Sequence, residues 1–139
     1  MLLNEGLETI GNNCFTQSKI ETISIPNSVK YIDQSAFASS SLAQIHFLGT
    51  ANNGLHDRRS SENINNSCPK IVKQQIVIEA CAFANCKNLK QVIFDPSSVV
   101  DEIRYKAFHC SALESFTAPS SLRKIGTLAF EGCLNLKSF

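Results

Sequence analysis

Two short patterns of hydrophobic and polar residues alternate along this chain. The first has the form I-x-x-x-(A/C)-F, in which a phenylalanine stands five residues after an isoleucine. It occurs five times, with its phenylalanines 22, 46, 25 and 22 residues apart, at Phe15, Phe37, Phe83, Phe108 and Phe130. A recurring pattern of this length predicts a stack of similar coils, because one coil alone cannot bury its own apolar side chains.

The second pattern follows each phenylalanine and alternates apolar with polar residues. In residues 20–26, Ile23 and Ile25 alternate with Thr22 and Ser24, and a proline follows. Related stretches occupy residues 42–47, 89–94, 113–119 and 136–139. A period of two is typical of a short strand with one buried face, and proline ends the pairing because it lacks an N–H. We therefore expect one strand in each coil, after which the I-x-x-x-(A/C)-F pattern returns the chain along the other side.

The phenylalanines are predicted to form one continuous column. A small residue precedes each of them, alanine in four coils and Cys14 in the first, and lets the backbone turn closely. Burial of one phenylalanine and three aliphatic side chains in each coil contributes about 6–12 kcal/mol before chain entropy is subtracted. This column is expected to hold the coils together.

These patterns, over residues 7–47 and 76–139, resemble the BspA-type leucine-rich repeats. The recurring text of that family is close to L-x-x-I-x-I-P-x-S-V-x-x-I-x-x-x-A-F-x-x-C-x-x-L, and residues 23–37 match it nearly throughout. The resemblance implies a right-handed solenoid with a parallel β-sheet on the concave side and irregular or short helical turns on the convex side. It also implies a binding protein of a kind found on bacterial and protozoan surfaces, without catalytic residues.

One gap between phenylalanines is about twice the others. We predict a single solenoid over residues 1–139, with about five repeats of 22–25 residues and an inserted loop at about 48–74. The insertion is rich in Asn, Ser and Gly, so we expect it to loop out of the stack into solvent.

A second interpretation makes the insertion a recognition or regulatory loop. Its candidate binding residues are His56, Asp57, Arg58 and Arg59. Two arginines directly before Ser60 and Ser61 are typical of a basophilic kinase site, where a phosphate could pair with them. The triplet at 65–67 is an acceptor for N-glycosylation, which has meaning only in a secreted chain.

Charge and hydropathy exclude two classes of partner. The 139 residues are 43% hydrophobic and 18% charged, as in an ordinary single domain, and the formal net charge is +1. A chain this close to neutrality has no strong field to attract nucleic acid. No apolar run approaches the roughly 18–20 residues that span a bilayer. Residues 1–6 lack the basic start of a secretory signal, so we expect a cytoplasmic protein, or a cell-surface protein if a longer precursor exists.

The cysteines are interpreted as small hydrophobic residues. Cys86, Cys110 and Cys133 lie two or three residues after their phenylalanines, which predicts that they share one repeat position and form a buried thiol column. A four-ligand zinc site could be drawn from Cys81, Cys86, His109 and Cys110. The C-x4-C spacing is unusual for structural zinc, so we predict no metal and no cofactor.

No arrangement of residues predicts catalysis. His56, Asp57 and Ser60 lie close in sequence within the inserted loop, where no rigid support is expected. His46 and His109 are isolated according to the repeat register. We therefore predict that the chain is not an enzyme.

Binding is expected at the outward face of the strands. The candidate residues alternate with the buried ones and are mostly neutral hydrogen-bonding side chains: Thr22, Ser24, Gln44, His46, Gln91, Ile93, Ser115, Thr117 and Ser138. Neither end shows a polar capping repeat, so end-on contacts with another solenoid or a larger assembly are also expected. These features favour a non-catalytic scaffold that binds proteins through this face, the inserted loop and the ends. The alternative is an adhesin fragment that binds host or matrix proteins outside the cell.

Overall fold

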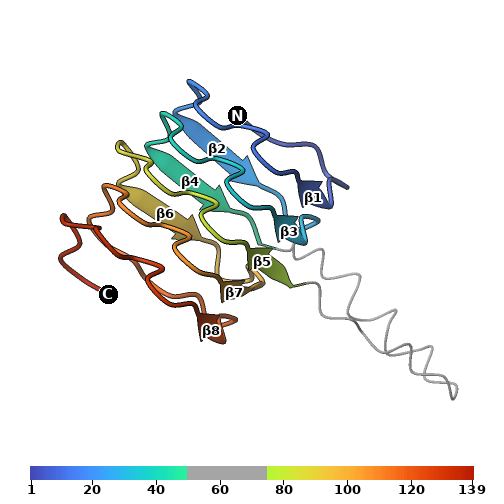
Figure 1. Cartoon of the computed structure of the whole chain (residues 1–139). Coiled ribbons are helices and arrows are strands. Elements are labelled where there is room, and N and C mark those ends of the chain that lie inside the picture. The colour runs from blue at the N-terminus through green and yellow to red at the C-terminus, as the bar shows by residue number, and fades with distance from the viewer. Residues whose placement is uncertain (50–74) are drawn as a thin grey trace, which may run out of the picture.

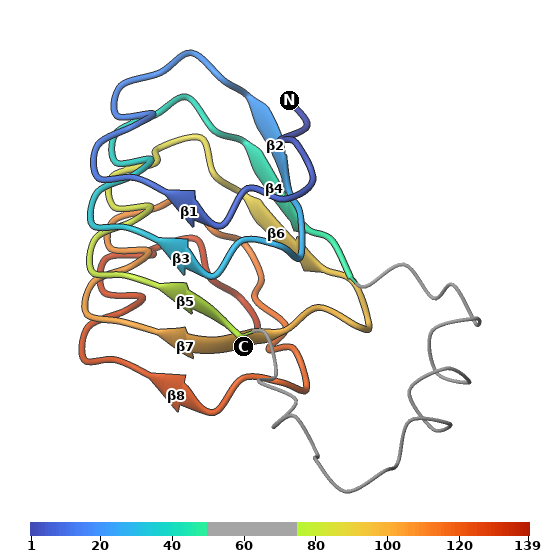
Figure 2. The same ribbon diagram turned by 90° about the vertical axis from the view of Figure 1, so that its right-hand side faces the viewer.

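The structure is a computed structural model that describes residues 1–49 and 75–139. Successive coils stack side by side, and their strands form two sheets, each of which consists of parallel strands (Figure 1). The two sheets are walls of the same stack, as the turned view shows (Figure 2). All of the predicted loop residues from His56 to Arg59, the kinase pattern and the glycosylation triplet lie outside the described residues.

The first sheet contains three of the five strands that the alternating pattern predicts. It has the order β2 (Thr22–Ile25), β4 (Gln44–Phe47), β6 (Gln91–Phe94), and all pairs are parallel and in register. Every second side chain points into the core, so Ile25 and Phe47 are fully buried. The strands align because equivalent residues of neighbouring coils bury the same face.

A second sheet has five short strands, in the order β1 (Thr9–Ile10), β3 (Tyr31–Ile32), β5 (Ile76–Ile78), β7 (Val100–Ile103) and β8 (Lys124–Ile125). The prediction of one strand per coil is therefore wrong. Each of these strands ends at the isoleucine that opens an I-x-x-x-(A/C)-F pattern. Because most of them have two residues, they are too short to show a period of two in the sequence.

The predicted phenylalanine column is confirmed. Rings of neighbouring coils lie 5.0 to 5.4 Å apart between centroids and are nearly parallel, with interplanar angles of 7° to 9°. Phe37, Phe83 and Phe108 have no exposed surface. Offset stacking of this kind adds about 0.5–1.5 kcal/mol per pair to the burial of each ring.

The turns around each phenylalanine are irregular, and no helix occurs in the described ranges. Two positions in each turn have a left-handed backbone, and their φ values lie between 53° and 75°: Asn13, Gln17, Ser35, Ser39, Cys81, Asn85, Lys106, Cys110, Leu128 and Gly132. This conformation directs alternate amides along the stack. The amides of Ser35, Phe37 and Ser39, for example, donate to carbonyls of the next coil at 2.8 to 3.3 Å.

The strand expected within residues 113–119 does not join the first sheet. Glu114 donates its amide to the carbonyl of Lys90, but none of the backbone hydrogen bonds of the described chain links residues 115–120 to β6. Ser115 instead bridges to Ser138. Pro119 stands where Asp95 stands in the preceding coil, and it has no amide to continue the ladder.

The predicted thiol column is only partly correct. Cys86 and Cys133 occupy one repeat position, but the residue that lies between them in the stack is Ser111 rather than Cys110. The Cys86 thiol donates to the carbonyl of Phe37 at 3.2 Å and lies 3.6 Å from the Ser40 hydroxyl. The column therefore mixes serine with cysteine, because either small side chain can donate to the carbonyl of the neighbouring phenylalanine.

Candidate protein-binding surfaces

The outward face of the β2-β4-β6 sheet carries six of the predicted binding residues. The register forms two rows across the sheet, in the orders Thr22, Gln44, Gln91 and Ser24, His46, Ile93. None of these side chains is buried. The side-chain Nε2 of Gln44 donates a hydrogen bond to the side-chain Oε1 of Gln91 at 3.4 Å. This face therefore presents hydrogen-bonding groups on a paired, rigid backbone.

His46 is not isolated, contrary to the prediction. Its Nε2 lies 2.5 Å from the Asp95 carboxylate, which also accepts the amide of Gly49 at 2.9 Å. The Gly49 hydrogen bond is the main cause, and His46 the second, of a pKa of Asp95 below its usual value. The cluster lies at the end of β6, where it adds a charged group to an otherwise neutral face.

Ser115 and Thr117 do not lie on the paired part of this face. They line a cleft of about 460 Å³ between β6 and residues 115–120. Its walls combine apolar side chains with polar ones, and its lining residues are Gln91, Val92, Ile93, Phe94, Asp95, Pro96, Ser115, Thr117, Ala118, Pro119 and Ser120. The cleft forms where the first sheet ends.

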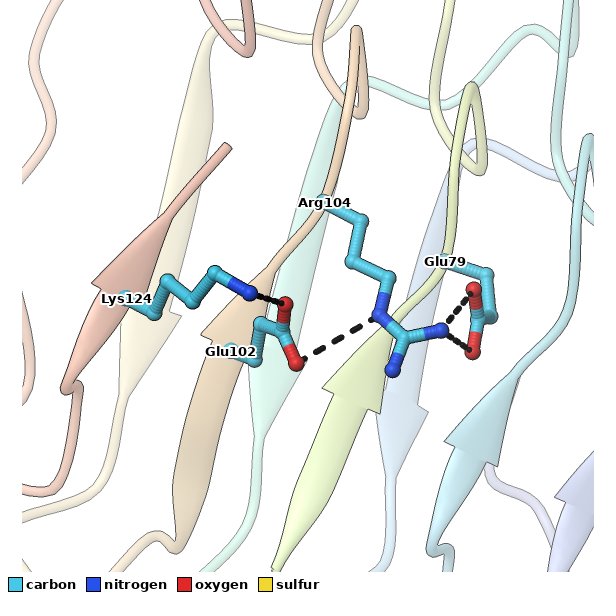
Figure 3. Close-up of polar contacts among 4 residues, drawn as sticks. All are labelled: Glu79, Glu102, Arg104 and Lys124. Carbon is cyan, nitrogen blue, oxygen red and sulfur yellow. Dashed lines mark hydrogen bonds and ion pairs between the residues drawn. The ribbon is translucent and has the colours of Figure 1, made fainter. Parts of the chain in front are cut away.

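The outward face of the second sheet carries a ladder of ion pairs (Figure 3). Lys124 contacts Glu102 at 2.9 Å, Glu102 contacts Arg104 at 3.4 Å, and Arg104 makes a two-pronged contact to Glu79 at 2.7 and 2.8 Å. The four side chains come from three neighbouring coils. Sequence reasoning missed this ladder because it did not predict the second sheet.

These pairs shift the pKa of their members. The hydrogen bond from Lys124 is the first cause of a lowered pKa of Glu102, with Arg104 contributing. The hydrogen bond to Glu79 raises the pKa of Arg104. Both shifts favour the charged forms of Glu102 and Arg104.

The two end coils expose apolar side chains. In the last coil Leu134 is 94% and Phe139 is 70% exposed, and in the first coil Leu2 is 69% exposed. Phe139 occupies the repeat position of Phe116, and their rings stack at 5.6 Å. Along the side of the stack, by contrast, the core side chains are buried.

The last candidate residues within the described ranges are His109 and the cysteines. His109 contacts Glu131 at 3.2 Å and Cys110 at 3.6 Å, so the prediction that it is isolated is wrong. No group of three metal-ligating side chains exists within 1–49 and 75–139. Burial raises the pKa of the Cys86 thiol, which keeps it protonated and unreactive.

A comparison with protein families finds the BspA type leucine rich repeat region, which matches residues 1–71 and 59–139 in six copies. The chain belongs to this family. Its repeats, stacked coils and parallel sheets are those of a leucine-rich-repeat solenoid. Among the described residues, no helix has the length and apolar character that crossing a membrane requires.

Two solved structures are similar to this leucine-rich-repeat chain. One is the pneumococcal vaccine antigen PcpA, with 20% identity and a TM-score of 0.52 over 94% of this chain and 35% of that one. The other is a leucine rich cell surface protein from Faecalibacterium prausnitzii A2-165, with 19% identity and a TM-score of 0.42 over 95% and 43% of the two chains. This chain therefore spans less than half the length of either structure. No match was found among curated proteins.

Proposed function

We propose that this chain is a non-catalytic module that binds proteins through the outward face of β2, β4 and β6. The observation that carries the proposal is the in-register row of unburied, mostly polar side chains on these strands. A paired backbone fixes their spacing, so this face loses little conformational freedom when a partner binds. The family of this chain is consistent with such a role.

The experiment compares proteins captured by the tagged chain and by variants of single surfaces. Gln44→Arg with Gln91→Glu changes the proposed face, and Thr9→Arg with Tyr31→Glu changes the second sheet as a matched control. A partner of the proposed face is retained by the control and lost from the first variant. Loss of the same partners from both variants, or from neither, contradicts the proposal.

A second candidate function is adhesion at the cell surface. It is supported by the similarity of this chain to a vaccine antigen and to a cell surface protein. The scaffold interpretation places the same binding face in the cytoplasm. Fractionation of the source cell with surface protease treatment separates the two, because only a surface protein is degraded while the cell is intact.

We also propose that two such solenoids can dock end to end. Glu8 and Arg123 occupy equivalent positions in the first and last coils, as do Glu21 and Lys137. Within the stack, an acidic residue of one coil pairs with a basic residue at the same position of the next coil. Glu8 pairs with Lys30 in this way, and Asp101 pairs with Arg123. A last coil placed against a first coil would therefore oppose basic to acidic residues while it covers the apolar ends.

Sedimentation of the 139-residue chain tests this contact. We expect association that rises with protein concentration, is lost in R123E with K137E, and returns when that variant is mixed with E8K and E21K. A chain that remains monomeric at high micromolar concentration contradicts end-on docking. It leaves the proposal for the sheet face unaffected.

A further inference from the structure

The sheet of β2, β4 and β6 stops before the stack does. In the order of that sheet β6 is an edge strand, although the following coil runs beside it. The last backbone hydrogen bond between them is from Glu114 to Lys90, after which residues 115–120 diverge. They rejoin the stack where Arg123 donates to the carbonyl of Asp101 at 2.8 Å. The gap is therefore local, with paired backbone at both of its ends.

Two sequence changes explain why the gap opens. The buried position held by Phe47 in β4 and Phe94 in β6 is held by Ala118 in the next coil. Alanine offers too little apolar surface to draw this segment back onto the core, and it is exposed. Phe94, whose ring meets the ring of Phe116 from that coil edge-on at 5.7 Å, is only partly buried, whereas Phe47 is fully buried.

The cleft therefore combines three features that a bound strand requires. It contains an unpaired strand edge, and such an edge is a template for a further strand. Its walls contain the apolar side chains of Val92, Phe94 and Ala118, while Ser115 and Thr117 supply hydroxyls. Its volume of about 460 Å³ lies within the range of roughly 300–1,000 Å³ typical of ligand sites.

We propose that this cleft binds an extended peptide segment of a partner protein as an additional strand on the edge of β6. Backbone hydrogen bonds to β6 supply affinity, and an aliphatic side chain of the peptide fills the space beside Ala118 and Phe94. Asp95, which lines the cleft, already contacts His46 and Gly49, so we expect an uncharged segment beside it. The inference rests on the proposed function, since it names the kind of partner that the sheet face accepts.

The chemistry of the occupant follows from the strands that are already paired. Strands β2 and β4 alternate inward aliphatic or aromatic residues with outward polar residues. A peptide with the sequence of residues 20–27 has this alternation and carries Ile23 and Ile25 at the two inward positions. It is therefore a suitable probe, and its polar side chains would face solvent as they do in β2.

The test measures fluorescence anisotropy of that labelled synthetic peptide with the full 139-residue chain. We expect saturable binding, which A118F weakens at least about ten-fold because the new ring occupies the apolar part of the cleft. A118D should weaken it similarly, because a carboxylate would meet the aliphatic side chain. T22F adds an equally exposed ring on β2, outside the cleft, and should leave the affinity unchanged. Melting curves of all three variants establish that each one is folded.

A second peptide tests the backbone contacts. It has the same sequence with N-methylated amides at alternate residues, which removes donors and leaves the side chains intact. We expect it to bind at least about ten-fold more weakly if its methylated edge faces β6. Absence of binding by the unmethylated peptide overturns the proposal, as does equal binding to the original chain and to A118F. If partner capture still depends on the sheet face in that case, only the cleft proposal has failed.

Discussion

At the residue scale, the fold depends on backbone conformations that most side chains adopt at a cost. Two left-handed residues in each turn direct amides toward the next coil, and side chains as large as Lys106 and Leu128 occupy such positions. Each costs about 1–2 kcal/mol relative to an ordinary conformation. These left-handed conformations make possible the backbone hydrogen bonds between coils, which offset that cost.

Gly126 and Gly11 occupy the same repeat position and make a matched pair. A Cβ at Gly126 would lie 2.7 Å from backbone atoms of Arg104 and Tyr105, whereas nothing lies within 4 Å of one at Gly11. We expect G126A to lower the free energy of unfolding by about 1–3 kcal/mol, since backbone must move. G11A should change it by less than about 0.5 kcal/mol. Urea melts of both variants check this, and equal effects would contradict the close approach.

The pKa of Asp95 predicts a dependence of stability on pH. Its folded-state pKa lies below the unfolded value of about 3.9, so its contribution is present above that value and is lost as pH falls through the folded pKa. D95N should therefore be less stable than the original chain at pH 7. The difference should shrink as the pH falls below about 4. Urea melts from pH 7 to pH 2.5 measure it, and a constant difference would count against the proposed linkage.

At the scale of elements, the two sheets are held by different side-chain chemistry. The first sheet has neutral outward residues, while β5, β7 and β8 are joined on their outer face by the charge ladder (Figure 3). Its members are partly exposed, and Arg104 has 44% of its side chain accessible. Each pair is therefore expected to contribute little, about 0.2–1 kcal/mol. The ladder aligns strands that are too short to fix their own register.

A double-mutant cycle on Arg104 and Glu79 measures this contribution. R104M keeps the aliphatic part of the side chain and removes the charge, and E79Q removes its partner. We expect a coupling energy of about 0.5–1 kcal/mol that decreases when the salt concentration is raised to 1 M. Lys90 and Glu114, at 3.5 Å and more exposed, form a control pair that should couple more weakly. A coupling unaffected by salt would contradict an ionic origin.

At the scale of the whole molecule, stability comes from repetition. The phenylalanine column runs through every coil, and each of the two sheets beside it consists of parallel strands (Figures 1 and 2). Each coil contacts its neighbours, so the energy of the stack is approximately a sum of coil and interface contributions. A position with a coil on each side should therefore matter more than one at an end.

Phe108 and Phe139 test that expectation. Phe108 is fully buried between Phe83 and Phe130, whereas Phe139 is 70% exposed. We expect F108A to lower the free energy of unfolding by about 3–5 kcal/mol. F139A should lower it by less than about 1 kcal/mol. Denaturant melts with a common m-value allow the comparison, and similar losses would contradict a dependence on flanking coils.

The repeat positions were predictable because burial in a solenoid recurs at the same place in every coil. The phenylalanine column and the inward residues of β2 and β4 follow directly from this periodicity. The assignment of Cys110 to the thiol column is wrong because both serine and cysteine occur at that repeat position. Only the spacing from the phenylalanine, and not the residue type, identifies the position. A count of three residues from each phenylalanine would have identified Ser111 instead.

The sequence by itself determined the family, the stacked architecture and which side chains are inside, since these depend on a local period that every coil repeats. The tertiary structure alone decided which polar groups meet. His46 and Asp95 are 49 residues apart, and Arg104 and Glu79 are 25 apart. Contacts across coils depend on register, on strands too short to show a period, and on where a sheet ends. The cleft beside β6 is set in the same way, because it requires Ala118, Pro119 and an unpaired edge at one place.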